Sequence, residues 1–269
     1  MVLRIPFPNC PLCGQAIGKA IGTFDCTAYP HYIEPLPKTL TWLICATCGH
    51  IYTDSYWSAQ GLEILLAKAH ACQVADGNFE QKRFLWSPVV QCVFAQLPLP
   101  ERGFDSGISW LDVGCGDGAL VMTAAEFGFD AAGLDSRREV IERIAALGYR
   151  AVQGDFLQSA VSKPLHVMSM ADVLEHFPYP AQALRKAHSM LNPGGLLYVS
   201  CPNNDCASWR AMDAASANPY WIEMEHCHNF SRRLLMQLLR ECGFNPLHYG
   251  ISQRYKAGME IVSRRTGSA

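Results

Sequence analysis

The sequence has none of the features of a membrane-embedded or secreted protein and little positive charge. No apolar run approaches the roughly 20 residues that span a bilayer, and two prolines interrupt the first ten residues, where a signal peptide would be apolar. Charged residues make up 17% of the 269 residues, the net charge is -2, and residues 1–50 hold no lysine–arginine cluster. We therefore expect no membrane contact and no nucleic-acid partner.

The sequence also lacks internal repeats and low-complexity tracts. It has 12 cysteines, several of them in apolar stretches, whereas secreted disulfide scaffolds are shorter and richer in loops. We therefore expect a reducing, cytoplasmic compartment. The hydrophobic fraction of 49% predicts one substantial core with a small appendage. Nothing in the composition indicates an oligomeric state.

The most informative stretch is LDVGCGDGAL, residues 111–120. An apolar lead-in predicts a buried parallel strand ending at Val113, and a helix is expected to begin at Ala119. Gly114, Gly116 and Gly118 allow a tight turn whose backbone can approach a ligand at the helix N-terminus.

Asp112 places a carboxylate at the tip of this strand, where it would repel a pyrophosphate and attract a cationic ligand. The pattern D-x-G-x-G-x-G resembles motif I of class I S-adenosylmethionine (SAM)-dependent methyltransferases, and SAM carries an ammonium and a sulfonium. The same glycines with Ala119 also satisfy the pattern of NAD-binding folds. Residues further along the chain must distinguish a SAM-binding fold from an NAD-binding one.

Downstream acidic residues continue the resemblance. Asp135 follows Gly114 by about 20 positions, where nucleotide-binding folds place a ribose-binding carboxylate. The resemblance implies that Asp155 accepts a hydrogen bond from the adenine amino group, that Phe156 lies against the adenine ring, and that Asp172 borders the cofactor.

Two further motifs favour a methyltransferase over an NAD-dependent dehydrogenase. Residues 173–176, VLEH, resemble a motif of small-molecule methyltransferases, and residues 192–195, NPGG, are foreign to NAD-dependent dehydrogenases. In the VLEH motif His176 is more often structural than catalytic. The Asn/Asp-Pro-Pro-Tyr motif of amine methyltransferases is absent, which argues against N-methylation. The resemblance implies an α/β, Rossmann-like, seven-stranded sheet with one antiparallel edge strand, over residues 103–269.

The N-terminal region has two copies of C-x-x-C-G. Cys10, Cys13, Cys45 and Cys48 supply the four thiolates that a structural zinc ion prefers. The spacing between the pairs is longer than usual, so we expect a zinc ribbon over residues 1–52 with an inserted loop near residues 30–37. Free thiols or a redox pair are the alternative.

Residues 53–102 predict a helical linker with a break at residues 76–78 and a boundary near Pro98, Pro100 and Gly103. Its aromatic residues are expected to pack between the ribbon and the large domain. An alternative is that Tyr56, Trp57 and Arg83 form a lid over the binding site.

The segment Glu225–Ser231 holds the candidate acid–base groups. Its E-H-x-x-x-F-S pattern resembles that of sugar C-methyltransferases with an N-terminal zinc domain, although this sequence lacks their additional C-terminal domain. The resemblance implies that Glu225 orients His226, which takes a proton from the acceptor, with His228 as the alternate base. Helix capping by Ser231 is the competing, structural explanation of this segment.

These features predict a SAM-dependent methyltransferase that modifies oxygen or carbon of a small molecule or sugar, including a nucleotide-linked one, with SAM as cofactor and one structural Zn²⁺. Two rivals remain: a zinc-ribbon enzyme that methylates RNA, and a non-catalytic SAM-binding protein. The low positive charge counts against the first. The intact glycines and acidic residues count against the second.

Overall fold

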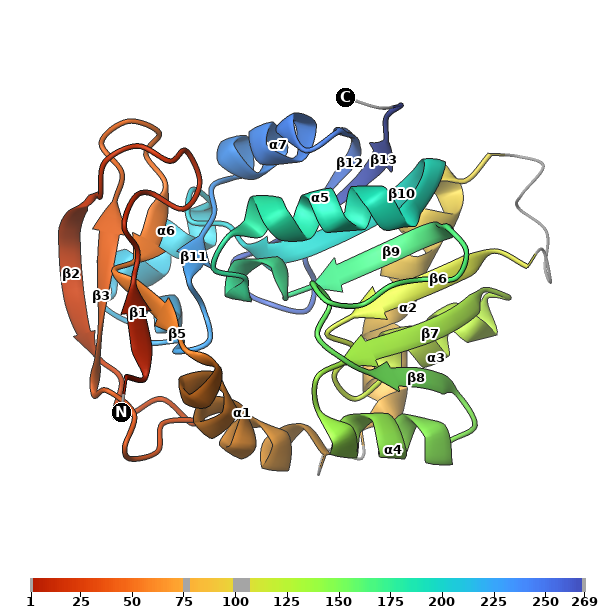
Figure 1. Cartoon of the computed structure of the whole chain (residues 1–269), viewed down its shortest axis with the longest axis horizontal. Coiled ribbons are helices and arrows are strands. Elements are labelled where there is room, and N and C mark those ends of the chain that lie inside the picture. The colour runs from red at the N-terminus through yellow and green to blue at the C-terminus, as the bar shows by residue number, and fades with distance from the viewer. Residues whose placement is uncertain (1, 75–77, 99–106, 268–269) are drawn as a thin grey trace.

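The computed structural model describes residues 2–74, 78–98 and 107–267. Figure 1 shows a seven-stranded sheet on one side of the molecule and smaller N-terminal strands on the other. The predicted α/β architecture is confirmed. Residues 76 and 77 of the predicted break at 76–78, and the predicted boundary at residues 102–103, lie outside the described residues.

The large sheet has the strand order β12-β13-β10-β9-β6-β7-β8, and β10, β9, β6, β7 and β8 are parallel neighbours. Its strands are β6 (Ser109–Val113), β7 (Asp130–Asp135), β8 (Arg150–Gln153), β9 (Leu165–Ala171), β10 (Leu191–Pro202), β12 (Phe244–Ile251) and β13 (Gly258–Arg265). The order reverses between β6 and β9. Ligands of open α/β sheets bind at such a switch point, beyond the carboxyl ends of the strands.

The sequence predicted that the antiparallel strand lies at the edge of the sheet, and this position is wrong. β13 runs antiparallel to β10 on one side and to β12 on the other, so β12 forms the edge. The burial of the two strands explains this position. Residues 258–263 of β13 are almost all buried, whereas most of β12 is partly or fully exposed.

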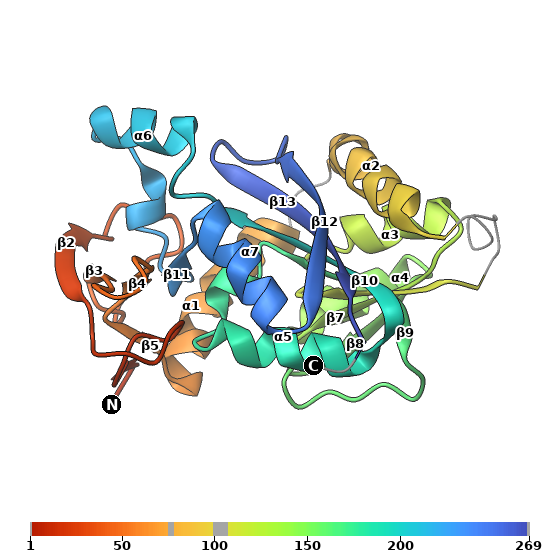
Figure 2. The same cartoon turned by 90° about the horizontal axis from the view of Figure 1, so that it is seen from above.

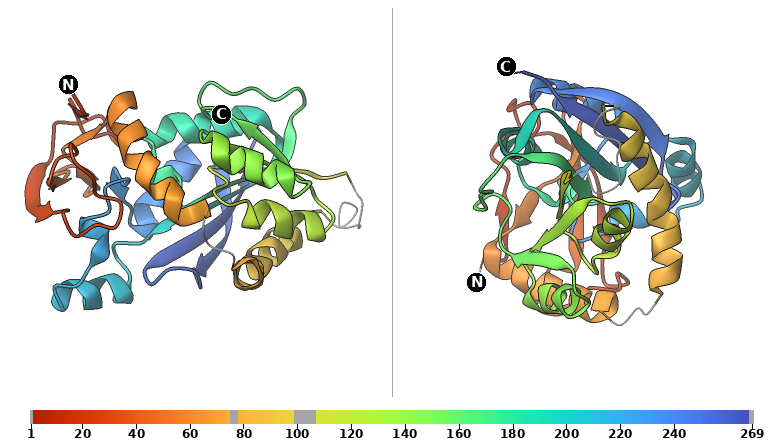
Figure 3. Two further views of the ribbon diagram at one scale, coloured as in Figure 1. Left: turned by 90° about the horizontal axis from the view of Figure 1, so that it is seen from below. Right: turned by 90° about the vertical axis from the view of Figure 1, so that its right-hand side faces the viewer.

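Helices cover both faces of the sheet, as Figures 2 and 3 show. One core contains residues of α5 (Pro180–Met190) and α7 (Arg232–Glu241), and the other contains residues of α2 (Phe79–Gln96), α3 (Ala119–Glu126) and α4 (Arg138–Ala146). The helices of these two cores hold the strand tips in place around the cavity described below.

The N-terminal sheet has the order β11-β4-β3-β2 and therefore includes a strand from the other end of the chain. It consists of β2 (Lys19–Asp25), β3 (Thr39–Ile44), β4 (Ile51–Thr53) and β11 (His228–Asn229), while β1 (Arg4–Pro6) pairs with β5 (Ser55–Trp57). Strand pairing thus continues past residue 52, the predicted end of the ribbon. β11 ties the ribbon directly to the large domain.

The predicted linker divides between two roles. α1 (Ala59–Val74) follows the ribbon, whereas Val89, Val90 and Val93 of α2 are buried in the core that contains β6. α2 is therefore a helix of the large domain. The long connection after β10 contains α6 (Ala207–Ala214) and the short 3-10 helix η3 (Pro219–Trp221). None of the described helices is long and apolar enough to cross a membrane.

Candidate active site

A cavity of about 630 Å³ lies at the carboxyl ends of the central strands. It is lined by residues from the glycine turn after β6, from the ends of β7 and β9, and from the ribbon. The predicted residues on its wall are Asp112, Gly114, Gly116, Asp135, Asp172, Glu225 and His226. The structure therefore gathers most of the predicted cofactor and acid–base residues around one space.

The three glycines of the turn have different physical roles. All have positive φ, at 66° for Gly114, 53° for Gly116 and 81° for Gly118. A Cβ on Gly116 would meet only the Arg137 guanidinium at 3.9 Å, so the backbone there is open to a ligand. Gly118 does not line the cavity, and a Cβ there would lie 2.7 Å from Ile144. Gly118 therefore permits close packing between α3 and α4.

Asp112 is buried at the tip of β6 and accepts a 2.6 Å hydrogen bond from the Ser169 hydroxyl. Burial raises the pKa of Asp112 to about 7, against the opposing effects of Ser169 and the positive charge of Arg254. A buried carboxyl group on a cavity wall is costly to ionise unless a cation binds beside it. This environment fits the positively charged end of a ligand.

Asp135 is held rigidly at the end of β7. Its Oδ2 accepts from the Gly116 N–H at 3.1 Å, and its two oxygens accept from the Arg137 guanidinium at 2.7 and 2.8 Å. These bonds couple the carboxylate to the glycine turn. The predicted ribose-binding residue is thus fixed in orientation before a ligand arrives.

Asp172 belongs to a cluster that the sequence did not reveal. Arg254, from the turn between β12 and β13, pairs with Asp172 and lies over the Trp86 ring at 3.9 Å. Asp172 also accepts from the Ser200 hydroxyl at 2.8 Å and has a φ of 57°. Trp86 and Arg254 both line the cavity. No motif marks either residue, because the cluster joins three segments far apart in the chain.

The predicted adenine contacts are not at this cavity. Phe156 is buried in the core and contacts Phe177 edge-on, with 6.0 Å between ring centroids. Asp155 is exposed and accepts the Leu157 N–H at 2.9 Å, as in a tight turn after an edge strand. Neither residue lines the cavity. In the linker, Lys82 and Trp86 of α2 line the cavity, whereas Tyr56, Trp57 and Arg83, the residues of the alternative lid hypothesis, do not.

The acid–base segment is organised differently from the prediction. His226 is paired with Glu223, at 3.0 Å from Nε2 to Oε2, and not with Glu225. Burial lowers the pKa of His226 well below its ordinary value and raises the pKa of Glu223 to about 7. His176 also lines the cavity, with its ring centroid 5.1 Å from that of His226. His176 thus lies on the cavity wall, although the VLEH motif predicted a structural role for it.

Glu225 binds two residues of the ribbon. Its Oε1 lies 2.7 Å from His31 Nδ1, and its Oε2 accepts the Tyr29 hydroxyl. Burial acts to raise the pKa of Glu225, but the hydrogen bonds from His31 and Tyr29 together lower it below the ordinary value. Glu225 is therefore ionised and turned toward the ribbon.

His228 is not positioned as an alternate base. It lies in β11, fully buried, with Nδ1 3.0 Å from His50 Nε2 and Nε2 2.9 Å from the Phe177 carbonyl oxygen. Side chains alternate along an extended segment, which directs His228 into the junction with the ribbon. Ser231 caps α7 by accepting the Leu234 N–H at 3.3 Å. The structural explanation of this segment thus holds for His228 and Ser231.

Comparison with known proteins agrees with this geometry. A family model described as a methyltransferase domain matches residues 90–249. The chain belongs to the class I SAM-dependent methyltransferases. Its donor is therefore SAM, and the acidic residues and glycines around the cavity fit this cationic ligand.

Curated relatives match this methyltransferase over part of its length. The ubiquinone biosynthesis O-methyltransferase of Pseudomonas paraeruginosa is 30% identical over 115 residues, 40% of this chain and half of that protein. The enzyme of the same name from Aliivibrio fischeri is 32% identical over 169 residues, 56% of this chain and 72% of that protein. The chain thus spans about half the length of some relatives that it matches.

Solved structures share the fold. The magnesium protoporphyrin IX methyltransferase of Synechocystis, solved with bound SAH, has a TM-score of 0.55 and 18% identity, and covers 77% of this chain and 95% of its own. A SAM-dependent methyltransferase from Clostridium acetobutylicum has a TM-score of 0.53 and 10% identity, over 72% and 94% of the two chains.

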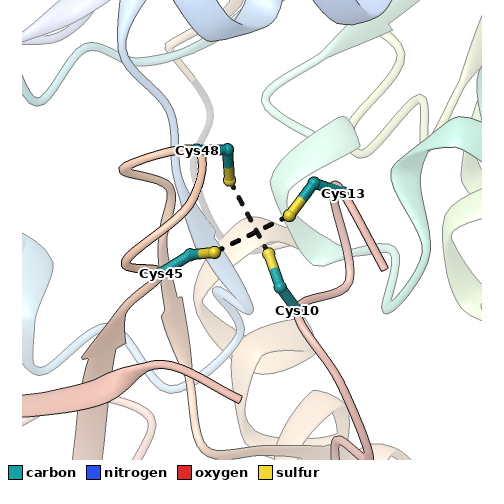
Figure 4. A group of neighbouring side chains, drawn as sticks. All are labelled: Cys10, Cys13, Cys45 and Cys48. Carbon is teal, nitrogen blue, oxygen red and sulfur yellow. Dashed lines mark hydrogen bonds between the residues drawn. The ribbon is translucent and has the colours of Figure 1, made fainter. Parts of the chain in front are cut away.

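The four predicted cysteine ligands of this methyltransferase converge in the ribbon (Figure 4). Cys10 and Cys48 have their sulfurs 3.8 Å apart, and Cys13 and Cys45 have theirs 3.6 Å apart. Thiolates bound tetrahedrally at about 2.3 Å from a zinc ion would be separated by about 3.8 Å. The glycine after each pair has a φ above 70° and donates its N–H back to the first cysteine carbonyl. The chain thus forms the two knuckles that a four-thiolate metal site needs.

Proposed function

We propose that this methyltransferase transfers the methyl group of SAM to an oxygen or carbon atom of a small molecule. The observation that carries the proposal is the single cavity that joins Asp112 and Asp135 to the histidine–carboxylate cluster. We define this cluster as Glu175, His176, Glu223, Glu225 and His226, with His31 of the ribbon. The cofactor residues and the groups able to take a proton thus face the same space.

Each cofactor residue has a distinct task in the proposal. Asp112 binds the ammonium end of SAM, and Asp135 accepts hydrogen bonds from the ribose hydroxyls. SAM supplies a methyl group on a positively charged sulfur, which a nucleophile displaces directly. The protein therefore has to align the acceptor with this methyl group and exclude water.

His226 is proposed as the base that takes the proton of the acceptor. Its low pKa keeps the imidazole neutral, which a base requires. The Glu223 carboxyl group, 3.0 Å away, can share the proton and balance the charge that forms on the ring. An oxygen or carbon nucleophile needs this step because it must lose a proton to react.

The metal of the ribbon is proposed to be one structural zinc ion held by Cys10, Cys13, Cys45 and Cys48. Four protein thiolates complete a tetrahedral shell and leave no open position for chemistry. The ion would hold the ribbon in place beside the cavity, and would take no part in methyl transfer.

The test is incubation of the purified protein with SAM labelled in its methyl group and an extract divided into small molecules, RNA and protein. The proposal expects label in the small-molecule fraction, and expects the His226→Gln variant to incorporate much less. Label confined to RNA would support the rival function and overturn this one. If His226→Gln incorporated as much methyl label as the native protein, His226 would not be the base.

A further inference from the structure

The ribbon contributes side chains directly to the cavity. Tyr29 and His31 lie in the segment between β2 and β3, and both line the cavity beside Glu225. The His31 side chain is 20% exposed, so it is partly buried but still accessible. The inserted ribbon segment therefore forms part of the wall of the binding site.

Glu225 fixes the orientation of His31. The carboxylate is ionised, so the proton of the 2.7 Å bond lies on His31 Nδ1, and the Tyr29 hydroxyl donates to the other oxygen. With Nδ1 engaged by Glu225, Nε2 is the second hydrogen-bonding atom of the ring, an acceptor in the neutral imidazole and a donor in the protonated one. No described residue of the chain is hydrogen-bonded to Nε2. His31 thus has a hydrogen-bonding atom left for a ligand.

The charge around His31 restricts the ligand that can bind there. Three carboxyl groups, those of Glu175, Glu223 and Glu225, line the cavity in this cluster. Glu225 is ionised, whereas burial raises the pKa of Glu175 and Glu223. The cations on the described cavity wall are already paired: Lys82 with Asp117, Arg137 with Asp135 and Arg254 with Asp172. A phosphate or carboxylate would lose its hydration without gaining a cation, which is costly in a buried site.

We propose that Tyr29, His31 and Glu225 form an acceptor-binding arm of the ribbon, and that the acceptor is a neutral or cationic molecule with several hydroxyl or amino groups. This inference rests on the proposed function, and it narrows the acceptor class. His31 Nε2 forms a hydrogen bond with one such group while His226 acts on another. The nucleotide-linked sugar that the sequence allowed does not fit this wall.

The test separates a small-molecule extract by anion exchange at neutral pH into an unretained pool, which holds neutral and cationic molecules, and a retained, anionic pool. Each pool is incubated with methyl-labelled SAM, and incorporation is measured over a dilution series. We expect label in the unretained pool. The His31→Ala variant should need about tenfold more of this pool for half-maximal rate, with the maximal rate close to native.

Further variants separate binding from folding. Glu225→Gln and Tyr29→Phe should also raise the amount of this pool needed for half-maximal rate. His31→Gln keeps a polar group at this position and should therefore raise it less than His31→Ala. Glu34→Gln lies on the same segment with an exposed side chain and should behave as native. Metal content and SAM affinity should be unchanged in all of them, which shows that the ribbon is folded.

Label only in the retained pool would overturn the inference and leave the proposed function intact. The inference would also be overturned, with the proposed function intact, if His31→Ala and Glu225→Gln reached half-maximal rate at the same amount of this pool as the native protein. No label in either pool would overturn the proposed function and this inference with it.

Discussion

His228 of the large domain lies opposite Tyr52 of the ribbon, in register, where β11 and β4 pair antiparallel. Next to this pair, the Thr53 N–H donates to the Cys227 carbonyl oxygen at 3.0 Å. The ribbon sheet therefore ends in the same segment that carries Glu225 and His226. This pairing connects the proposed metal site to the proposed proton-transfer groups, because β4 directly follows the second cysteine pair.

Loss of the metal is predicted to reduce methyl transfer more than SAM binding. Cys45→Ser removes one thiolate, and structural zinc contributes on the order of 10 kcal/mol to folding in small zinc domains. The variant should lose the metal and most of its activity, while SAM affinity changes little because Asp112 and Asp135 lie in the large domain. Metal analysis, calorimetric SAM titration and label incorporation measure the three quantities. Full activity of a metal-free variant would contradict the coupling.

Asp112 is predicted to dominate SAM affinity. Asp112→Asn removes a charged partner of the ammonium group and should weaken binding about 10- to 100-fold, the range for a charged hydrogen bond. The Asp112 pKa of about 7 without ligand adds a pH dependence. Only the carboxylate attracts the cation, so affinity should fall as the pH drops below 7 and level off above it. Asp112→Asn should lose this dependence on the low-pH side.

Ser169→Ala is the comparison variant, because it keeps the Asp112 carboxyl group and should weaken SAM binding less. It removes the hydrogen bond to Asp112 and also the acceptor of the Trp110 indole N–H at 2.8 Å, so its thermal unfolding is measured alongside. Equal SAM affinity of Asp112→Asn and the native protein, measured by calorimetry, would show that the ammonium group binds elsewhere.

His226 and His228 are predicted to give opposite phenotypes. His226→Gln should lower turnover about 10²- to 10⁴-fold, the usual effect of losing a general base, with little change in SAM affinity. His228→Gln should keep most of its turnover and lower the melting temperature, because His228 bonds His50 and the Phe177 carbonyl inside the junction. Turnover and thermal unfolding of both variants separate the two roles. If His228 were the base, His228→Gln would lose turnover and His226→Gln would keep it.

The sequence predicted the local strand–turn–helix motif well, and it predicted poorly the contacts that depend on distant segments. Gly114, Gly116 and Asp112 reach the cavity as expected, because strand, turn and helix are local and leave recognisable spacings. His31 and Glu225 are 194 residues apart, and Arg254 reaches Asp172 from another hairpin. Such pairings depend on how the ribbon docks. The adjacent position of His226 therefore suggested a pair with Glu225 that the fold does not make.

The most direct test of the account is thermal unfolding of the native protein with increasing SAM, with its demethylated product, and with NAD. A ligand that binds only the folded state raises the melting temperature with concentration. We expect SAM and its product to raise it progressively, Asp112→Asn to shift this response to higher concentrations, and NAD to have no effect. A rise with NAD and none with SAM or its product would contradict the account.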